Sequence, residues 1–186
     1  MALSDTELII NAQNGDSLAF EELVYRYDKM VLKIAMKYFG DPDVAKDIYQ
    51  EVFIKVYKGL KSFQFKSSFS TWLFRITSNV CLTHKGNRRN MNLSLNVEND
   101  SEEENKFIAN EKSSPEEQMI NKDFGEKIDK ALKVLSPNQK MSFLLKHYEG
   151  YKIKEIAEMM NCKEGTIKKY LFEAVRKLRV QLGEIY

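Results

Sequence analysis

Helix-breaking residues and cysteines are scarce in this sequence. Its 186 residues include 8 Gly, 3 Pro and 2 Cys, and no segment alternates apolar and polar residues in the manner of a strand. This composition disfavours β-sandwiches and barrels and favours an all-α chain. Cys81 and Cys162 lie far apart in the sequence, so we expect reduced thiols rather than a disulfide framework.

Long apolar runs are missing as well. No stretch reaches the roughly 18 apolar residues that a membrane-spanning helix needs. The segment 1–5 has neither a basic start nor an apolar run, which argues against a signal peptide. With 43% hydrophobic and 30% charged residues, the composition is that of a soluble globular protein. We therefore expect a cytoplasmic chain without membrane insertion.

Motifs of catalysis and metal binding are also absent. The sequence has no glycine-rich phosphate loop and no nucleophile motif. Cys81 and His84 are three residues apart, but no second close pair completes a zinc site, and His147 and Cys162 are isolated. We expect a protein that is not an enzyme and has neither a metal nor a cofactor.

The net charge is only +2, but the charged residues are unevenly distributed along the sequence. Residues 1–90 carry 13 basic and 10 acidic side chains, residues 91–118 carry 2 and 8, and residues 119–186 carry 14 and 9. The acidic segment, with few aromatics, buries too little apolar surface to offset chain entropy. We predict two small helical domains, 1–90 and 119–186, joined by a flexible acidic linker, 91–118. Basic lobes of this kind suggest a nucleic-acid partner.

Capping residues and periodicity predict the helices. Asp16 and the pair Asp41-Pro42 are typical of helix starts, as is Ser136-Pro137. Four helices are expected in the first domain, at about 5–14, 16–40, 41–60 and 70–86. Four more are expected in the second domain, at about 119–135, 137–150, 153–160 and 164–182.

The last two helices have the spacing of a helix-turn-helix. Ile156 and Ala157 belong to the apolar stripe of the first, and Ile167 anchors the second. Asn161 lies in the turn, where a left-handed conformation is needed and asparagine tolerates it. The exposed face of the second helix is basic and suits the major groove of DNA. A helical hairpin with a solvated basic face is the alternative.

The third helix of the first domain has an unusual exposed face. Opposite its apolar stripe, the wheel places two carboxylates, an amide and a lysine around an isoleucine: Asp47, Gln50, Glu51, Ile54 and Lys58. An apolar anchor rimmed by charge is typical of a protein-binding surface. An ordinary polar surface with one exposed isoleucine is equally consistent with the residues alone.

The segment 61–69 and the fourth helix combine aromatic and basic residues. Aromatic rings stack on unpaired bases and cations hold the backbone, so a loop with both suits single-stranded DNA. The wheel places Trp72, Leu73, Ile76 and Val80 inward and Arg75, Ser78, Asn79 and Leu82 outward. The alternative is that the aromatics fill the core, which we expect of Trp72 and at least one phenylalanine.

Three stretches carry a family resemblance. The segments 151–157 and 164–168 resemble region four of sigma factors, 41–63 resembles region 2.2, and 69–76 resembles regions 2.3 and 2.4. Together they are similar to extracytoplasmic-function (ECF, group IV) sigma factors of the sigma-70 family. The resemblance implies an alternative sigma factor that binds core RNA polymerase and directs it to promoters, with domain 1–90 as region 2 and domain 119–186 as region 4.

The resemblance also implies roles for residues. The coiled coil of the largest polymerase subunit would bind Asp47, Gln50 and Glu51, with Ile54 and Lys58 added from the wheel. The minus-ten element would contact Gln64, Lys66, Ser67, Ser68, Arg75, Asn79, Arg88 and Arg89. The minus-thirty-five element would contact Gly165, Thr166, Lys168, Lys169, Phe172, Glu173 and Arg176. Where the family often has arginine, Glu173 could accept from a cytosine amino group.

Two rival functions remain at this point. A stand-alone helix-turn-helix regulator would use the same DNA-binding helix but have no polymerase face. A pure interaction protein would not direct transcription. The resemblance further implies an anti-sigma factor as partner and a linker that threads through polymerase, although a plain spacer fits the acidic segment equally well.

Overall fold

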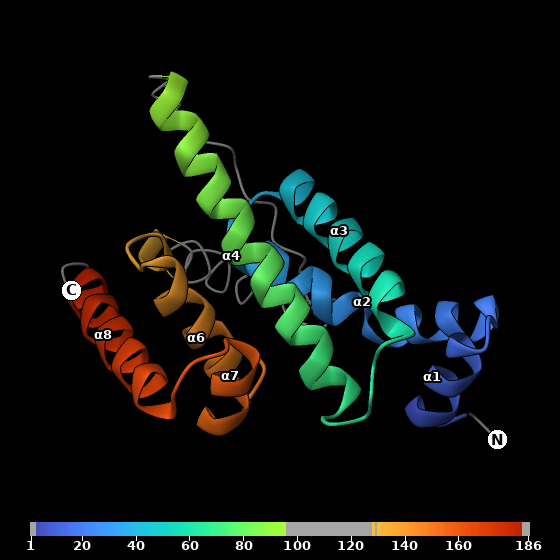
Figure 1. The fold of residues 1–186 in the computed structure, drawn as a ribbon. Coiled ribbons are helices and arrows are strands. Elements are labelled where there is room, and N and C mark those ends of the chain that lie inside the picture. The colour runs from blue at the N-terminus through green and yellow to red at the C-terminus, as the bar shows by residue number, and fades with distance from the viewer. Residues whose placement is uncertain (1–2, 96–127, 129, 184–186) are drawn as a thin grey trace, which may run out of the picture.

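A computed structural model describes residues 3–95, 128 and 130–183 of the chain, with the backbone alone for 85–95. Within this part all regular structure is helical, which confirms the all-α prediction (Figure 1). The helices are α1 (Asp5–Gln13), α2 (Ser17–Phe39), α3 (Pro42–Leu60), α4 (Phe69–Leu95), α6 (Pro137–His147), α7 (Ile153–Met159) and α8 (Glu164–Gly183). Most of the predicted helix 119–135 and the rest of the acidic linker lie outside the described residues, but residues 128 and 130–133 are described and are helical.

Side-chain caps explain where the helices begin. The Asp16 carboxylate accepts from two backbone amides at the start of α2, and Asp41 does the same at the start of α3. Ser136 and Gln139 form a reciprocal capping box at the start of α6. These side chains satisfy amides that a helix leaves without partners, so the starts are fixed locally.

Helix α4 is longer than predicted. It continues through Gly86 to Leu95, whereas the predicted helix ends near Gly86 and the predicted first domain ends at residue 90. A glycine inside a helix costs only about 1 kcal/mol relative to alanine. Gly86 is therefore too weak a signal to end a helix of this length.

Helices α1 to α4 form the first lobe around one apolar core. The facing surfaces of α2 and α3 bury Val31, Ala35, Ile48 and Val52. The side-chain amide of Gln13 donates to the carbonyls of Leu60 at 2.9 Å and Phe63 at 3.0 Å, which ties α1 to the end of α3.

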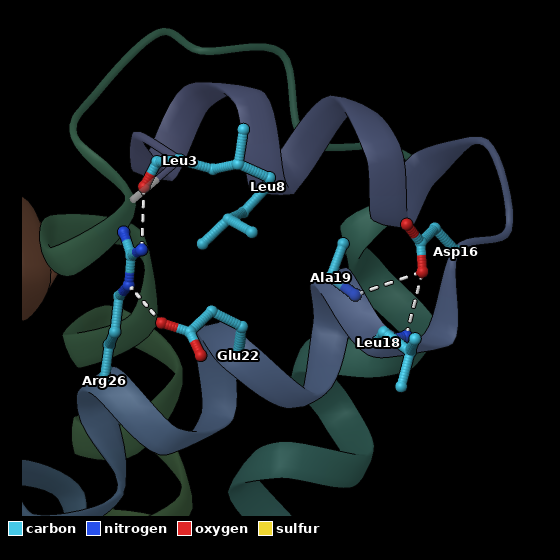
Figure 2. A pocket seen from close by; sticks show the side chains of 7 residues that line it. All are labelled: Leu3, Leu8, Asp16, Leu18, Ala19, Glu22 and Arg26. Carbon is cyan, nitrogen blue, oxygen red and sulfur yellow. Dashed lines mark hydrogen bonds and ion pairs between the residues drawn. The ribbon is translucent and has the colours of Figure 1, made fainter. Parts of the chain in front are cut away.

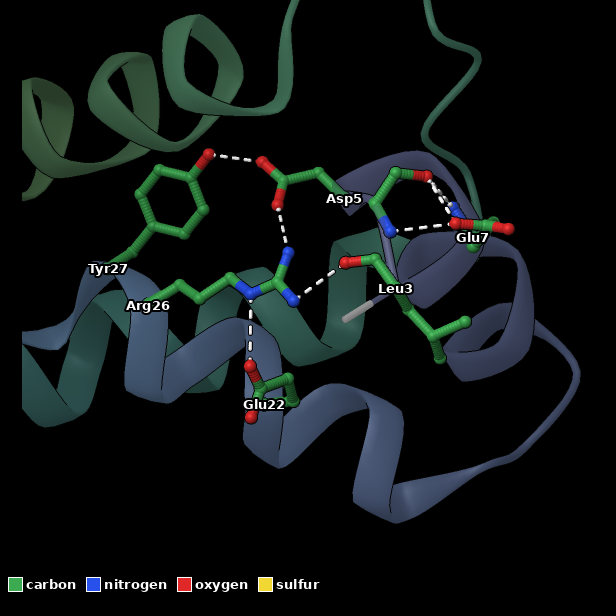
Figure 3. A network of polar contacts seen from close by, with 7 residues as sticks. Leu3, Asp5, Glu7, Glu22, Arg26 and Tyr27 are labelled. Carbon is green, nitrogen blue, oxygen red and sulfur yellow. Dashed lines mark hydrogen bonds and ion pairs between the residues drawn. The ribbon is translucent and has the colours of Figure 1, made fainter. Parts of the chain in front are cut away.

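A polar network also holds the N-terminus against α2 (Figure 3). The Arg26 guanidinium donates to Asp5 at 2.9 Å, to Glu22 at 3.0 Å and to the Leu3 carbonyl at 2.7 Å, and the Tyr27 hydroxyl donates to Asp5. The hydrogen bond to Asp5 is the largest cause of the raised pKa of Arg26. This side chain therefore links three segments at the end of the first lobe.

Trp72 closes the space between α3 and α4. A Cβ built on Gly59 would lie 3.2 Å from the Cζ2 atom of Trp72, so any larger residue there would have to push the indole aside by a few tenths of an ångström. On the other sides the indole meets the rings of Phe63 and Phe69, with centroids 5.0 and 5.8 Å away. The expected core role of at least one phenylalanine is confirmed, since Phe63 and Phe69 are buried, and Trp72 is partly buried against the same core.

Helices α6, α7 and α8 form the second lobe. Its core includes Leu144, Ile156, Ile167 and Leu178. Between α7 and α8 the chain turns at Asn161, whose φ of 51° is left-handed as predicted. The two helices and their turn thus have the expected helix-turn-helix arrangement.

The two lobes pack against each other, with α6 and α7 beside α2 and α4. The Tyr151 ring packs on Phe74, and Glu149 pairs with Lys33 at 3.5 Å. Helix α4 consequently has a second buried face that includes Phe74 and Ser78. The prediction that Ser78 points outward is wrong, because the wheel of a single helix carries no information about a second lobe.

Candidate nucleic-acid and protein interfaces

The outward face of α3 carries the five side chains that the sequence analysis grouped there. Positions 47, 50, 51, 54 and 58 lie opposite the buried stripe of α3. Four of these side chains are exposed, and Ile54 is 53% exposed despite being apolar. Glu51 is partly buried and pairs with Lys55 at 3.2 Å. The face is an apolar centre with acidic and basic groups around it.

Tyr57 was missed by the sequence analysis. It is 65% exposed, and its ring meets Phe20 of α2 edge to face at 5.1 Å. It follows Ile54 by three residues on α3, and this spacing could have placed it on the same side. Tyr57 extends the exposed apolar surface of α3 toward α2.

The loop between α3 and α4 presents a second group. Phe63 and Phe69 are buried, whereas Phe65 is 43% exposed and has a φ of 57°. A left-handed conformation is costly for a bulky residue and is often associated with function. Around Phe65 the side chains of Gln64 and Lys66 are exposed, so polar, basic and aromatic groups meet in one loop.

The two loop serines that were predicted to contact DNA, Ser67 and Ser68, form hydrogen bonds within the protein. The Ser68 hydroxyl accepts from the Thr71 amide at 3.2 Å and contacts the Thr71 hydroxyl at 2.8 Å, at the start of α4. Ser67 is partly buried and donates to the Ser68 carbonyl at 3.3 Å. Ser68 therefore serves as a helix cap, and base contact would add a second role.

Helix α4 continues the same surface. Arg75 and Asn79 are exposed one turn apart, as the wheel predicted. Arg88 and Arg89 fall within α4, but their side chains lie outside the described residues. The described part of this surface therefore consists of the loop 61–69 together with Arg75 and Asn79 of α4.

Helix α8 has a clearly divided surface. Ile167, Ala174 and Leu178 are buried against the rest of the second lobe. On the other side four long side chains are exposed: Lys168, Lys169, Phe172 and Arg176. Gly165 leaves open space at the start of the helix, and Thr166 is partly buried. A basic helix face with a free N-terminal half matches the predicted recognition helix.

The side chain of Glu173, in contrast, is held by contacts within the second lobe. One carboxylate oxygen accepts from the Gln139 side-chain amide at 2.7 Å, and the other lies 3.9 Å from the Lys169 ammonium. Gln139 is buried at the start of α6. The carboxylate links α8 to α6, so the contact with a cytosine amino group would require this link to break.

The described residues also contain a shallow pocket of about 400 Å³ between α1 and α2 (Figure 2). Its polar groups already have partners: Asp16 caps α2 and Arg26 is held in its network. Within the described residues no group of three or more His, Cys, Asp or Glu converges as a metal site. Burial raises the pKa of the Cys81 thiol to about 12, so it stays protonated at neutral pH.

Among the described helices none is long and apolar enough to cross a membrane. The candidate surfaces in the described part of the chain are three solvent-exposed areas: the α3 face, the loop with α4, and the α8 face. None of them is a cavity, and each suits contact with a macromolecule.

Family models match most of the two lobes. One described as Sigma-70 region 2 matches residues 23–90, and one described as Sigma-70, region 4 matches residues 125–178. The chain is 33% identical over 175 residues to the ECF RNA polymerase sigma-E factor of Escherichia coli, covering 92% of this chain and 91% of that protein. It is 30% identical over 172 residues to the RNA polymerase sigma-H factor of Pseudomonas aeruginosa, covering 91% and 89%.

Solved structures share the fold. The sigma factor RpoE of Bartonella quintana, solved with the anti-sigma factor NepR, has a TM-score of 0.69 at 24% identity, covering 88% of this chain and 96% of that one. CnrH, solved with the cytosolic domain of CnrY, has a TM-score of 0.69 at 20% identity, covering 97% of each chain. With both family regions matched and relatives aligned along nearly the whole length, the chain belongs to the sigma-70 family, among the ECF RNA polymerase sigma factors.

Proposed function

We propose that this chain recruits core RNA polymerase to promoters through three separate surfaces. The α3 face binds polymerase, the loop 61–69 with α4 binds the minus-ten element, and α8 binds the minus-thirty-five element. The observation that carries the proposal is the exposure of all three surfaces on a chain of the sigma family. A stand-alone regulator is not favoured, because the relatives along the whole length are sigma factors.

The α3 face suits a helical partner such as the coiled coil of the largest polymerase subunit. Ile54 offers an apolar anchor, and Asp47 and Gln50 beside it are exposed and not used by the first lobe's core. Charged groups at the edge of an interface mainly increase the association rate and select the partner. Burial of an anchor such as Ile54 supplies affinity.

The loop and α4 suit the opened minus-ten element. A melted base needs a surface that replaces its lost stacking, and an aromatic ring contributes about 1–3 kcal/mol per base. Phe65 is the exposed ring of this loop, with Lys66 next to it for the backbone. We therefore add Phe65 to the predicted minus-ten residues. Opening is thus driven by binding energy, without a catalytic group.

Helix α8 suits duplex DNA at the minus-thirty-five element. Lys168, Lys169 and Arg176 can neutralise phosphates and release counterions, which gives affinity that decreases with salt. The helix then places its N-terminal half against base edges.

An anti-sigma factor and a cytoplasmic location complete the proposal. Two proteins of similar fold were solved as complexes: the sigma factor RpoE with the anti-sigma factor NepR, and CnrH with the cytosolic domain of CnrY. A partner of that class would silence this chain by covering one of the three surfaces. The domain boundaries 1–90, 91–118 and 119–186 remain part of the proposal, with the acidic linker following polymerase's basic channels.

The decisive experiment reverses charge on α3. The double variant Asp47→Lys, Gln50→Lys should bind core polymerase at least tenfold more weakly and lose promoter-directed transcription, since two cations then replace an acidic and a neutral group beside the Ile54 anchor. Glu21→Lys, on the exposed surface of α2, is the matched control and should bind normally. Equal affinity of both variants, with unchanged thermal unfolding, would refute a polymerase role for this face.

A further inference from the structure

We propose that Phe172 selects thymine in the minus-thirty-five element by contact of its ring with the thymine methyl group. The inference rests on the proposed function of α8 and adds a base identity to it. It starts from the exposure of an apolar ring on a helix face that is otherwise basic.

Phe172 is 70% exposed, the largest exposed fraction among the large apolar side chains that the structure describes in the second lobe. The apolar residues that hold α8 in place, Ile167, Ala174 and Leu178, are buried on the other side of the helix. Packing within the lobe therefore does not account for a phenyl ring at position 172. A large apolar side chain left in water is more often part of a binding surface.

The surroundings of Phe172 identify the class of partner. Lys168 lies one turn before it and Arg176 one turn after it, and both are exposed. An apolar protein surface would have to desolvate these cations, which is costly without paired acidic groups. A polyanion that also presents an apolar group can pair its negative charges with the cations and place the apolar group against the ring. Duplex DNA has this combination in its major groove.

The position of Glu173, next to Phe172 in the sequence, also favours DNA as the partner of the ring. Glu173 is turned toward α6 and held by Gln139 at 2.7 Å. It also lies 3.9 Å from Lys169, so its negative charge is partly balanced within the lobe. The exposed surface around Phe172 is thus basic and apolar, without a free carboxylate beside the ring.

Among the four bases, only thymine presents an apolar group to a side chain in the major groove. Bases in duplex DNA are stacked, so a ring on a helix in the major groove meets their edges and not their faces. Of these edges only that of thymine carries an apolar group, its C5 methyl, while the others present hydrogen-bonding groups that phenylalanine cannot satisfy. Phe172 therefore favours thymine where it contacts the groove floor.

The test removes the methyl group without changing base pairing. A minus-thirty-five element is first selected from a randomised promoter library with wild-type holoenzyme. Each thymine in it is then replaced singly by deoxyuridine. At one thymine we expect wild-type holoenzyme to bind about fourfold more weakly, the value of one buried methyl group. Phe172→Ala holoenzyme should not distinguish the two bases at that position.

Val180→Ala provides the control, since Val180 is also exposed and apolar on α8 but lies two turns further along. That variant should keep the wild-type response to deoxyuridine. Indifference of wild-type holoenzyme to every replacement would overturn the inference, as would a selected element without thymine. So would a deoxyuridine response that persists in Phe172→Ala, because the ring would then serve another partner. Loss of promoter binding in wild type would instead refute the proposed function.

Discussion

The ring of Tyr151, between α6 and α7, meets the ring of Phe74 on α4 edge to face, with centroids 5.2 Å apart at an interplanar angle of 68°. Phe74 is fully buried by this contact and its neighbours. The two promoter elements are centred about 25 base pairs apart, on the order of 85 Å of duplex. A compact chain of this size has a radius of gyration of about 16 Å, so the proposed function requires the lobes to separate on the promoter.

Tyr151→Ala should loosen the contact between the lobes. It removes an aromatic pair worth about 0.5–1.5 kcal/mol beyond its burial and uncovers Phe74. We expect a larger radius of gyration than wild type by small-angle X-ray scattering, with the same helix content by circular dichroism. Tyr151→Phe keeps the ring and should scatter like wild type. Identical scattering of all three proteins would mean that other contacts hold the lobes.

Stability should depend on Tyr151 at alkaline pH. Burial, with smaller contributions from Glu149 and Glu155, raises its pKa to about 12 from the ordinary value of 10. The unfolded chain loses this proton first as the pH rises, so the stabilisation is complete below pH 10 and is lost as the pH rises toward 12. The free energy of unfolding of Tyr151→Phe should therefore fall less steeply than that of wild type above pH 10. Parallel curves would contradict this.

The pair Gln139 and Glu173 permits an exchange experiment. Gln139→Glu keeps the capping box of α6 but places a second carboxylate against Glu173, and should cost about 1–3 kcal/mol. Adding Glu173→Gln restores a donor and an acceptor in exchanged positions and should recover most of the loss. Urea unfolding of both single variants and the double variant measures this coupling. Additive effects would show that the 2.7 Å contact does not contribute to stability.

Phe65→Gly should separate stability from promoter opening. Glycine adopts the observed φ of 57° without strain, which offsets the loss of the ring's contact with Phe63, whose centroid is 5.1 Å away. We expect unfolding within about 1 kcal/mol of wild type. Open-complex formation, followed by permanganate reactivity of unpaired thymines, should be at least tenfold slower. Normal opening by this variant would exclude Phe65 from the melted site.

The sequence was sufficient for the starts of the described helices and for the exposure of most residues on the candidate surfaces, because caps and periodicity are local. Asp16, Asp41 and Ser136 mark helix starts that the structure confirms. The α3 face also followed from the spacing of its residues. The role of Glu173 could not be predicted in this way, because its partner Gln139 is 34 residues away and no local pattern pairs the two residues.

Other features depend on the whole molecule. Ser78 is buried one turn after Phe74, which meets Tyr151 of the second lobe, and a helical wheel does not include that lobe. The exposure of Phe65 depends on the sign of one dihedral angle in a loop with three phenylalanines of equal hydrophobicity. Only the fold shows which of the three is excluded from the core.

The position of Trp72 has a practical consequence. It is the one tryptophan in the sequence, and it lies on Gly59 between rings that belong to the proposed melting loop. Intrinsic fluorescence of the chain excited at the indole band therefore comes from a single site beside the proposed melting loop. A change in Trp72 emission would therefore report a change in the packing of Phe63 and Phe69, the two buried rings of that loop, without an added dye.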